Sequence, residues 1–383
     1  MSYIVDIATA VPKHSVSNTE LIHFYSNAVE ASGLGPITRK LNIISDKTKI
    51  KNRYSCISDF NGISKELFTT GNSEPTVERI MEVYKEKLMP LATCAIDKLM
   101  RQTNCKPNEI THLITVSCTG VFAPGFEFLV AEHYDLRHTE KLGLNFLGCY
   151  AAVKAIKHAH YIASAVPSAC ILIICAELCS LHFTPSIDDE DVLSNLLFAD
   201  GAAAVLVVGN EHKKSEDQTV LGITAISSAS IPHTLDLMTW NISSSAFRMH
   251  LSKYIVDAIR ENVSSAISEF LHEASSTADY WAIHPGGVRI VDAVKESLEL
   301  TDNDIQDSLA ILENYGNMSS PTILFVLQRI FDKIKKDPYN ENKNIVTCAF
   351  GPGLTIEMMN LAVVNTTAKS NVIQTLIDYE IQK

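Results

Sequence analysis

Short runs of apolar residues alternate along this chain with longer segments in which apolar positions recur every three or four residues. The runs predict buried strands and the longer segments predict amphipathic helices. Strands are predicted at residues 111–119, 169–178, 202–209, 280–284 and 344–350. Helices are predicted at residues 75–101, 149–163, 247–271 and 319–336. This alternation is typical of an α/β fold.

A polar segment at residues 210–219 interrupts the pattern, and it is charged and nearly free of apolar side chains. Such composition between strands is typical of a surface linker. It divides the chain into an N-terminal half, residues 1–210, and a C-terminal half, residues 219–383. Both halves contain the same kinds of strand and helix, which favours a duplicated architecture. The tail, residues 365–383, is predicted to form a short amphipathic helix.

Composition excludes several classes of protein. The 383 residues are 46% hydrophobic and 20% charged, so the chain can bury a large core. The net charge of -12 argues against nucleic-acid binding, so an anionic substrate would need a local basic patch. Nine cysteines without a C-x-x-C pair or a His/Cys cluster favour a reduced protein without a metal site. With no signal-peptide pattern and no apolar run long enough to span a bilayer, we expect a cytoplasmic protein that does not bind membranes.

Cys149 stands between Gly148 and an Ala-rich helical segment. The glycine permits a tight turn and the close approach of a ligand. A thiolate at a helix N-terminus is stabilised by the helix dipole and by unpaired N–H groups, which lower the cysteine pKa. We therefore expect a nucleophile there. The alternative is a small buried core residue.

His284 ends a predicted strand and is followed at once by Pro-Gly-Gly. Strand ends that face a crevice carry ligand chemistry in α/β proteins, although a structural histidine fits as well. Asn317 follows Gly316 and precedes a predicted helix, so it could also be a simple N-cap. Together with Cys149, the two residues form a coherent set. The thiol attacks an acyl carbonyl, and histidine and asparagine donors stabilise an oxyanion or enolate. A cysteine protease would use the same residue types.

Five motifs set the context of these residues: LGCYAA, LFADGAAAVLVVG, AIHPGG, YGNMSS and FGPGLTIE. Their order and combination, from about residue 47 to residue 363, resemble the chalcone-synthase-like type III polyketide synthases. The resemblance implies a thiolase-like α/β fold with five layers, αβαβα, and two similar halves. It also implies a homodimer that uses CoA thioesters and needs no metal or redox cofactor.

The resemblance assigns roles to individual positions. Cys149 would hold the starter and the growing chain as a thioester, while His284 and Asn317 would bind the malonyl-CoA carbonyl and stabilise the enolate. Phe198 and Phe247 fall at the family's two gatekeeper positions, although both would also fit as plain core aromatics.

Other positions would line the family's substrate cavity. They are Cys118, Thr119, Cys179, His182, Thr239, Ser319 and the loop Phe350, Gly351, Pro352 and Gly353. Plant members usually have threonine where this chain has Cys118, Cys179 and His182, so we expect a product other than a plant chalcone. Thr239 lies near a position that is often glycine, and its extra bulk favours a shorter product.

A basic segment resembles the family's CoA entrance and supplies Lys47, Lys49, Lys51 and Arg53 within a few residues. Local positive charge of this kind attracts phosphates, although a solvated charged surface has the same composition. The loop that usually begins with glycine in this family begins here with Ala349, which would be strained if that position required a positive φ.

The predicted function is iterative decarboxylative condensation of malonyl-CoA onto an acyl-CoA starter, followed by cyclisation to a pyrone or phenolic product. A ketoacyl synthase III-like enzyme, which performs one condensation on a carrier protein, is the nearest alternative. The HPGG and FGPG motifs favour the iterative enzyme. An HMG-CoA-synthase-like enzyme would need an identifiable glutamate acid/base. A non-catalytic partner subunit of the thiolase fold would be expected to lack Cys149, His284 or Asn317, and all three are present.

Overall fold

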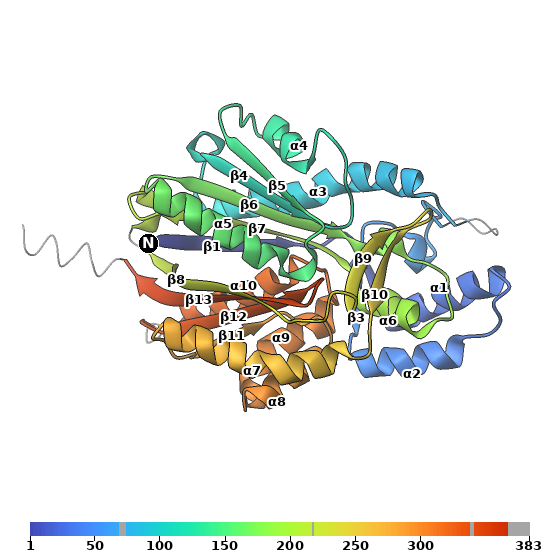
Figure 1. Cartoon of the computed structure of the whole chain (residues 1–383). Helices are drawn as coiled ribbons and strands as arrows, with labels where there is room; N and C mark the ends of the chain where they lie inside the picture. The colour runs from blue at the N-terminus through green and yellow to red at the C-terminus, as the bar shows by residue number, and fades with distance from the viewer. Residues whose placement is uncertain (69–73, 217, 338–340, 367–383) are drawn as a thin grey trace, which may run out of the picture.

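The computed structural model describes residues 1–68, 74–216, 218–337 and 341–366 (Figure 1). Its strands are β1 Ser2–Ala10, β2 His14–Ser17, β3 Asn52–Ser55, β4 His112–Ser117, β5 Glu140–Asn145, β6 Cys170–Leu178, β7 Asp200–Gly209, β8 Thr219–Ser230, β9 Met238–Ile242, β10 Phe247–Leu251, β11 Tyr280–Ile283, β12 Asn344–Gly351 and β13 Thr355–Asn365. Its helices are α1 Asn18–Ala31, α2 Thr38–Thr48, α3 Val77–Thr103, α4 Phe126–His133, α5 Ala151–Ala165, α6 Asp189–Leu197, α7 Ile255–Glu273, α8 Val288–Ser297, α9 Asp302–Tyr315 and α10 Thr322–Lys335.

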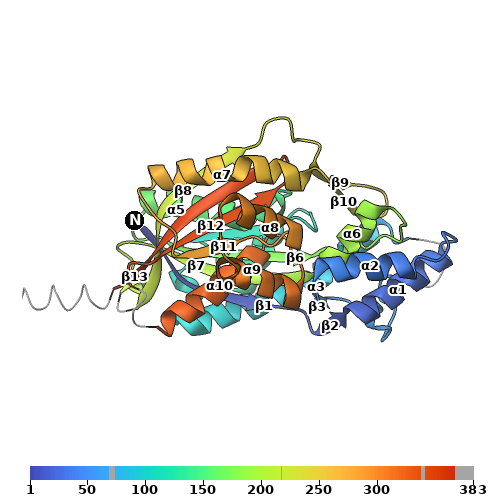
Figure 2. The same ribbon diagram turned by 90° about the horizontal axis from the view of Figure 1, so that it is seen from below.

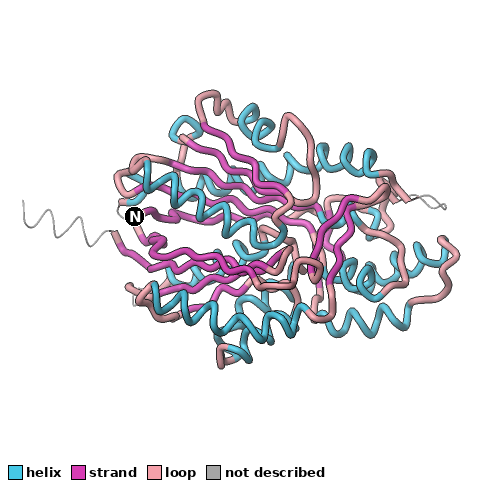
Figure 3. The backbone as a smooth tube through the Cα atoms, viewed as in Figure 1, coloured by secondary structure: helices cyan, strands magenta, loops and turns pink. Residues whose placement is uncertain are grey.

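One mixed sheet runs through both halves of the molecule in the order β11-β12-β13-β8-β1-β7-β6-β4-β5. The pairs β11–β12, β4–β5 and β4–β6 are parallel, and the remaining pairs are antiparallel. The halves meet where β1 pairs with β8, and this pairing is short: it extends from Ser2↔Ile223 to Ile4↔Leu221. Two smaller sheets pair β9 with β10 and β2 with β3. The β9–β10 pair stands across the ends of the main strands (Figure 3).

Helices cover and separate the two parts of this sheet (Figures 1 and 2). One apolar cluster joins α3 to β1, β6 and β7. A second cluster contains α5 and α10 together with strands from both halves, so these helices form the central layer. A third joins α7 and α8 to β11, β12 and β13. The layers therefore alternate as helix, sheet, helix, sheet and helix, which confirms the predicted thiolase-like α/β architecture.

The five predicted strands all occur, as β4, β6, β7, β11 and β12. Strands β6 and β7 are buried along their whole length, as continuous apolar runs predict. Three predicted helices occur as α3, α5 and α10. The helix predicted over residues 247–271 is partly wrong, because Phe247–Leu251 is strand β10 and pairs with β9 before α7 begins at Ile255. The turn before it favours a hairpin, since Ser243 N–H donates to the Ala246 carbonyl.

The polar segment connects β7 to β8 and contains a 3₁₀ turn at Lys213–Ser215. Most of the predicted tail helix lies outside the described residues, because β13 continues to Asn365 and the description ends at residue 366. Within the described ranges, no helix has the length and apolar character needed to cross a membrane.

Candidate active site

Cys149 lies in a 3₁₀ turn, Gly148–Tyr150, that leads directly into α5. Gly148 has φ +75°, and a Cβ atom there would approach Pro352 Cδ to 2.4 Å. Any other residue would therefore clash with the FGPG loop as well as strain the backbone. Close packing of this loop on Gly148 fixes where the Cys149 side chain emerges.

His284 follows the last residue of β11, and its N–H donates to the Cys348 carbonyl at 2.9 Å. The side chain is buried, and neither ring nitrogen has a hydrogen-bond partner. Burial lowers the pKa of His284 to about 3, so the ring is neutral at physiological pH. One ring nitrogen can therefore donate to a ligand and the other can accept.

Asn317 is held by both its backbone and its amide. Its N–H donates to the Leu197 carbonyl and its own carbonyl accepts from Ala199 N–H, which places it beside Phe198. Its side-chain Oδ1 accepts from Ser319 N–H at 2.9 Å, while Nδ2 donates to the Gly286 carbonyl at 3.3 Å. Asn317 is not an N-cap, because α10 begins only at Thr322.

The three candidate catalytic residues line one cavity of about 700 Å³. Cys149 reaches it from the head of α5, His284 from the end of β11, and Asn317 from the α9–α10 connection. Phe198 and Phe350 also line this cavity. The fold thus brings Cys149 together with two residues that lie more than a hundred positions further along the sequence, as the catalytic set requires.

The state of the Cys149 thiol differs from the sequence-based expectation. Burial raises the pKa of Cys149 to about 11, and the carboxylate of Glu177 adds to the increase. Hydrogen bonds with Ser319 and Asn317 act in the opposite direction. The expected lowering by the helix terminus is therefore outweighed by the loss of water around the sulfur. The resting residue is a thiol, which must lose its proton before it attacks.

Three predicted cavity residues lie beside the Cys149 cavity. Cys179, His182 and Phe247 line a smaller cavity next to it. His182 Nε2–H donates to the Thr119 carbonyl at 2.7 Å, and Nδ1 accepts from Phe247 N–H at 3.0 Å. The two rings stack with centroids 4.4 Å apart. Burial lowers the pKa of His182 to about 4, which keeps the ring neutral.

Cys118, Thr119 and Thr239 line neither of these two cavities. Cys118 Sγ accepts from Gly148 N–H at 3.0 Å, so this thiol supports the turn that carries the nucleophile. The Thr119 hydroxyl donates to Glu177 at 2.8 Å and accepts from a backbone N–H. Thr239 lies on β9, where its hydroxyl accepts from a neighbouring asparagine. The position of Thr239 therefore does not support the expectation that its side chain narrows the substrate cavity.

The FGPG loop lies against the nucleophile turn. A Cβ atom at Gly351 would approach the Tyr150 ring to 2.4 Å, so a glycine is needed there for close packing. Gly353 N–H donates to the Met238 carbonyl at 3.3 Å, which ties the loop to β9. Ala349 lies in β12, paired with Glu357, and its φ is not positive. The alanine is thus accommodated without the strain considered from the sequence.

The four predicted CoA-binding cations do not lie together. Lys47 lines the Cys149 cavity, whereas Lys49 and Lys51 are exposed and Lys51 pairs with Glu313 at 2.5 Å. Arg53 is buried, and its guanidinium donates to the Leu196 carbonyl and to an asparagine, both at 2.6 Å. The prediction that Arg53 binds CoA phosphates at the surface is therefore wrong.

Two cations that the sequence reasoning missed line the same cavity as Lys47. They are Lys253, which follows β10, and Arg289, which follows the HPGG motif. The position of Arg289, two residues after the end of the HPGG motif, could have indicated it. Asp189 and Glu190 also line the cavity, where Asp189 pairs with Lys40 and Glu190 contacts the His250 ring. Lys47, Lys253 and Arg289 form no ion pair with any described residue, so these three cations are available to an anionic ligand.

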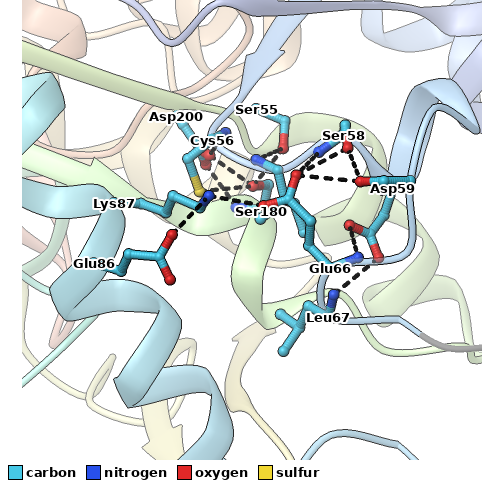
Figure 4. A network of polar contacts seen from close by, with 12 residues as sticks. Ser55, Cys56, Ser58, Asp59, Glu66, Leu67, Glu86, Lys87, Ser180 and Asp200 are labelled. Carbon is cyan, nitrogen blue, oxygen red and sulfur yellow. Dashed lines mark hydrogen bonds and ion pairs between the residues drawn. The ribbon is translucent and has the colours of Figure 1, made fainter.

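Hydrogen bonds to the buried carboxylate of Asp200 hold the start of β7, the strand that follows Phe198 (Figure 4). Asp200 accepts from Cys56 N–H and Ser180 N–H at 2.7 Å and from the Ser180 hydroxyl at 2.6 Å. These bonds fix the start of β7 against the segment Cys179–His182.

In the part of the chain that the structure describes, no group of three or more His, Cys, Asp or Glu side chains could hold a metal ion.

The layered fold agrees with the comparisons to known proteins. Residues 1–211 match the N-terminal domain of the chalcone and stilbene synthases, and residues 223–365 match their C-terminal domain. The chain belongs to the chalcone and stilbene synthase family. Its members are condensing enzymes that transfer acyl groups, the type III polyketide synthases.

Similar proteins support the assignment of this chain to the family. The crystal structure of PKS-I from the brown alga Ectocarpus siliculosus is 26% identical, with a TM-score of 0.86, and covers 95% of this chain and 98% of that one. The 1,3,6,8-tetrahydroxynaphthalene synthase of Streptomyces coelicolor A3(2) is 25% identical, with a TM-score of 0.83 and coverage of 95% and 99%. Polyketide synthase 37 of Dictyostelium discoideum is 30% identical over 346 residues, 88% of this chain but 11% of that protein. The chain thus spans only a small part of this curated relative.

Proposed function

We propose that this protein condenses malonyl-CoA repeatedly with an acyl-CoA starter held on Cys149, and that the product then cyclises to a pyrone or phenol. One observation carries the proposal: Cys149, His284 and Asn317 line a single cavity that three cations also line. A thioester carbonyl and a CoA phosphate are the two groups that such a cavity would bind together.

Loading begins when the Cys149 sulfur attacks the starter carbonyl and CoA leaves as a thiol. Because the pKa of Cys149 is raised to about 11, the proton must be taken up as the bond forms. His284 has an unpartnered ring nitrogen in the same cavity and can relay this proton to the leaving CoA sulfur in one concerted step, because its lowered pKa disfavours a free imidazolium.

Extension uses His284 and Asn317 as hydrogen-bond donors. The malonyl thioester carbonyl accepts from His284 and from Asn317 Nδ2, and loss of CO₂ leaves an enolate whose negative oxygen those donors stabilise. The enolate carbon attacks the Cys149 thioester, the new C–C bond forms, and the cysteine sulfur leaves. The β-ketoacyl-CoA product returns its acyl group to Cys149 before the next extension.

The proposal extends to assembly and location. The family resemblance supports a homodimer that takes CoA thioesters and needs no metal or redox cofactor. All nine cysteines are free thiols, which supports a cytoplasmic location because reduced cysteines persist in a reducing compartment.

Mass spectrometry of the intact protein tests the proposed chemistry. After incubation with acyl-CoA starters, we expect one acyl group on Cys149 in the wild type and none in Cys149→Ala. The malonyl donor is then varied between malonyl-CoA and carrier-bound malonate. This comparison separates the proposal from a ketoacyl synthase III-like enzyme. Condensation that occurs only with carrier-bound malonate, and stops after one round, would favour that alternative.

A further inference from the structure

Two cysteines that the proposed reaction does not use lie in contact in the N-terminal half. Cys105 Sγ and Cys170 Sγ are 4.0 Å apart, although the two residues are separated by 65 positions in the sequence. Both belong to the apolar cluster that joins α3 to the main sheet. A disulfide bond is about 2.0 Å long, so the two sulfurs need to approach by about 2 Å to form one. Rotation about a Cα–Cβ bond moves a sulfur this far.

The two cysteines differ in how firmly the backbone holds them. Cys170 is the first residue of β6, where its N–H donates to the Thr111 hydroxyl at 3.0 Å and its carbonyl accepts from Thr111 N–H at 2.8 Å. Cys105 follows Asn104, which ends α3, and precedes the 3₁₀ turn Pro107–Glu109. It is 6% exposed, whereas Cys170 is fully buried. Cys105 is therefore the cysteine that a small molecule reaches from solvent.

A lysine from the polar segment between β7 and β8 places positive charge beside this pair. Lys214 Nζ donates to the Asn104 carbonyl at 2.6 Å, directly next to Cys105. A hydrogen bond from the Cys170 thiol lowers the pKa of Cys105, and the charge of Lys214 acts in the same direction, although burial opposes both. The same hydrogen bond, together with burial, raises the pKa of Cys170. Cys105 therefore ionises first, and Cys170 remains a thiol.

We propose that Cys105 and Cys170 form a reversible oxidation site, at which a peroxide converts the two thiols to a disulfide. The Cys105 thiolate attacks one peroxide oxygen, the O–O bond breaks, and the other oxygen leaves as hydroxide and takes up a proton to become water. Cys105 is then a sulfenic acid. The Cys170 sulfur attacks the Cys105 sulfur, the S–S bond forms, and the sulfenic oxygen leaves as water with the Cys170 proton. One hydrogen peroxide is thus reduced to two waters as the two thiols are oxidised.

The site is independent of the condensation reaction. Cys170 starts the nine-residue strand β6, and the segment Cys179–His182 near the Cys149 cavity follows the other end of that strand, about 25 Å away. Burial raises the pKa of Cys149 to about 11, so at neutral pH almost none of it is the thiolate that reacts with peroxide. The Cys105–Cys170 pair should therefore oxidise while Cys149 remains a thiol.

Peptide mass spectrometry of the folded full-length protein tests the site. The protein is fully reduced, freed of reductant and treated with hydrogen peroxide at neutral pH, and all remaining thiols are then alkylated with N-ethylmaleimide in denaturant. We expect a peptide pair linked through Cys105 and Cys170, which a thiol reductant separates, while Cys149 carries N-ethylmaleimide. The absence of this linked pair, or oxidation of Cys149 before the pair closes, would overturn the proposal.

Cysteine variants test which sulfur reacts first. Cys170→Ser keeps a hydrogen-bond donor beside Cys105 but cannot close a disulfide, so the Cys105 sulfenic acid should accumulate and be trapped by dimedone. Cys105→Ser should give no dimedone adduct at Cys170. An adduct at Cys170 in place of Cys105 would contradict the assigned order.

A matched pair of lysine variants tests the role of the charge. Lys214→Met should slow disulfide formation severalfold, because the pKa of Cys105 rises and less thiolate is present. Lys213→Met is the control, since Lys213 is exposed in the same 3₁₀ turn, and it should close the disulfide at the wild-type rate. Equal rates in the two lysine variants would show that Lys214 does not activate Cys105.

Discussion

The Cys149 thiol donates a hydrogen bond to the hydroxyl of Ser319, with 3.7 Å between Sγ and Oγ. Ser319 is itself positioned by Asn317, whose side-chain oxygen accepts from Ser319 N–H. The nucleophile and the proposed enolate-binding asparagine are therefore connected through one serine. This arrangement gives the buried sulfur two polar contacts, one with Ser319 and one with Asn317.

Replacing Ser319 should make Cys149 harder to ionise. When Cys149 loses its proton, the Ser319 hydroxyl can donate to the thiolate, and this bond lowers the pKa of Cys149. Ser319→Ala should therefore raise that pKa further above about 11. The rate of alkylation by iodoacetamide between pH 8 and 10 should fall severalfold, because only the thiolate reacts. Ser297→Ala, at a surface helix, is the control and should keep the wild-type profile. A pH profile for Ser319→Ala that overlays the wild type would remove Ser319 from this role.

Decarboxylation separates the roles of the three catalytic candidates. His284→Ala and Asn317→Ala should each reduce CO₂ release from malonyl-CoA about 10²- to 10³-fold, the usual effect of losing one oxyanion donor. Cys149→Ala should abolish condensation and keep some CO₂ release, because the two donors remain. Scintillation counting of carboxyl-labelled malonyl-CoA measures this directly. Normal CO₂ release by either donor variant would contradict the assigned role.

The cations of the larger cavity should act on phosphates and not on the acyl group. Lys253→Ala and Arg289→Ala should raise KM for malonyl-CoA roughly three- to tenfold at low ionic strength, and the effect should shrink as salt is added. Lys51→Ala is the matched control, since Lys51 pairs with Glu313. With N-acetylcysteamine thioesters, which carry no phosphate, the variants should match the wild type. Equal losses with both kinds of thioester would show that these residues do not bind CoA phosphates.

Two buried histidines should make the protein less stable in mild acid. Burial lowers the pKa of His182 to about 4 and that of His284 to about 3, compared with about 6.5 in the unfolded chain. Between these values the unfolded state binds more protons, so stability is full above pH 6.5 and falls as the pH falls. Each histidine contributes up to about 1.4 kcal/mol per pH unit in that range.

Urea unfolding at pH 7, 6 and 5 measures this dependence. His182→Gln should show a smaller loss of unfolding free energy between pH 7 and 5 than the wild type. The exposed His23→Gln is the control and should show the wild-type loss. Equal pH dependence in His182→Gln and the wild type would mean that His182 is not buried as a neutral ring.

Much of the fold follows from the sequence because its strands are continuous apolar runs. Strands β6 and β7 are buried on both faces, so nearly all of their residues are apolar. Phe247 misled the prediction, because one buried aromatic fits a helix face and a hairpin equally well. Only the pairing of β10 with β9 distinguishes the two, and pairing is a long-range property.

The candidate site shows the same limit. Cys149, His284 and Asn317 each carry a local signal in a turn, a strand end or a glycine-bounded loop, and the sequence indicated all three. The burial of a single side chain carries no such local signal. In the sequence, Arg53 looks like one more surface cation in a basic run, yet it is buried inside the protein. Burial also raises the pKa of Cys149, which a helix terminus alone would lower.

The central claim is that this chain builds polyketides from CoA thioesters. The most direct test is mass spectrometry of the products formed by the purified protein from ¹³C-labelled malonyl-CoA and a series of short to long acyl-CoA starters. The account predicts products that differ by labelled two-carbon units and that are absent with Cys149→Ala. No labelled product from any starter, or a single extension that requires a carrier protein, would contradict it.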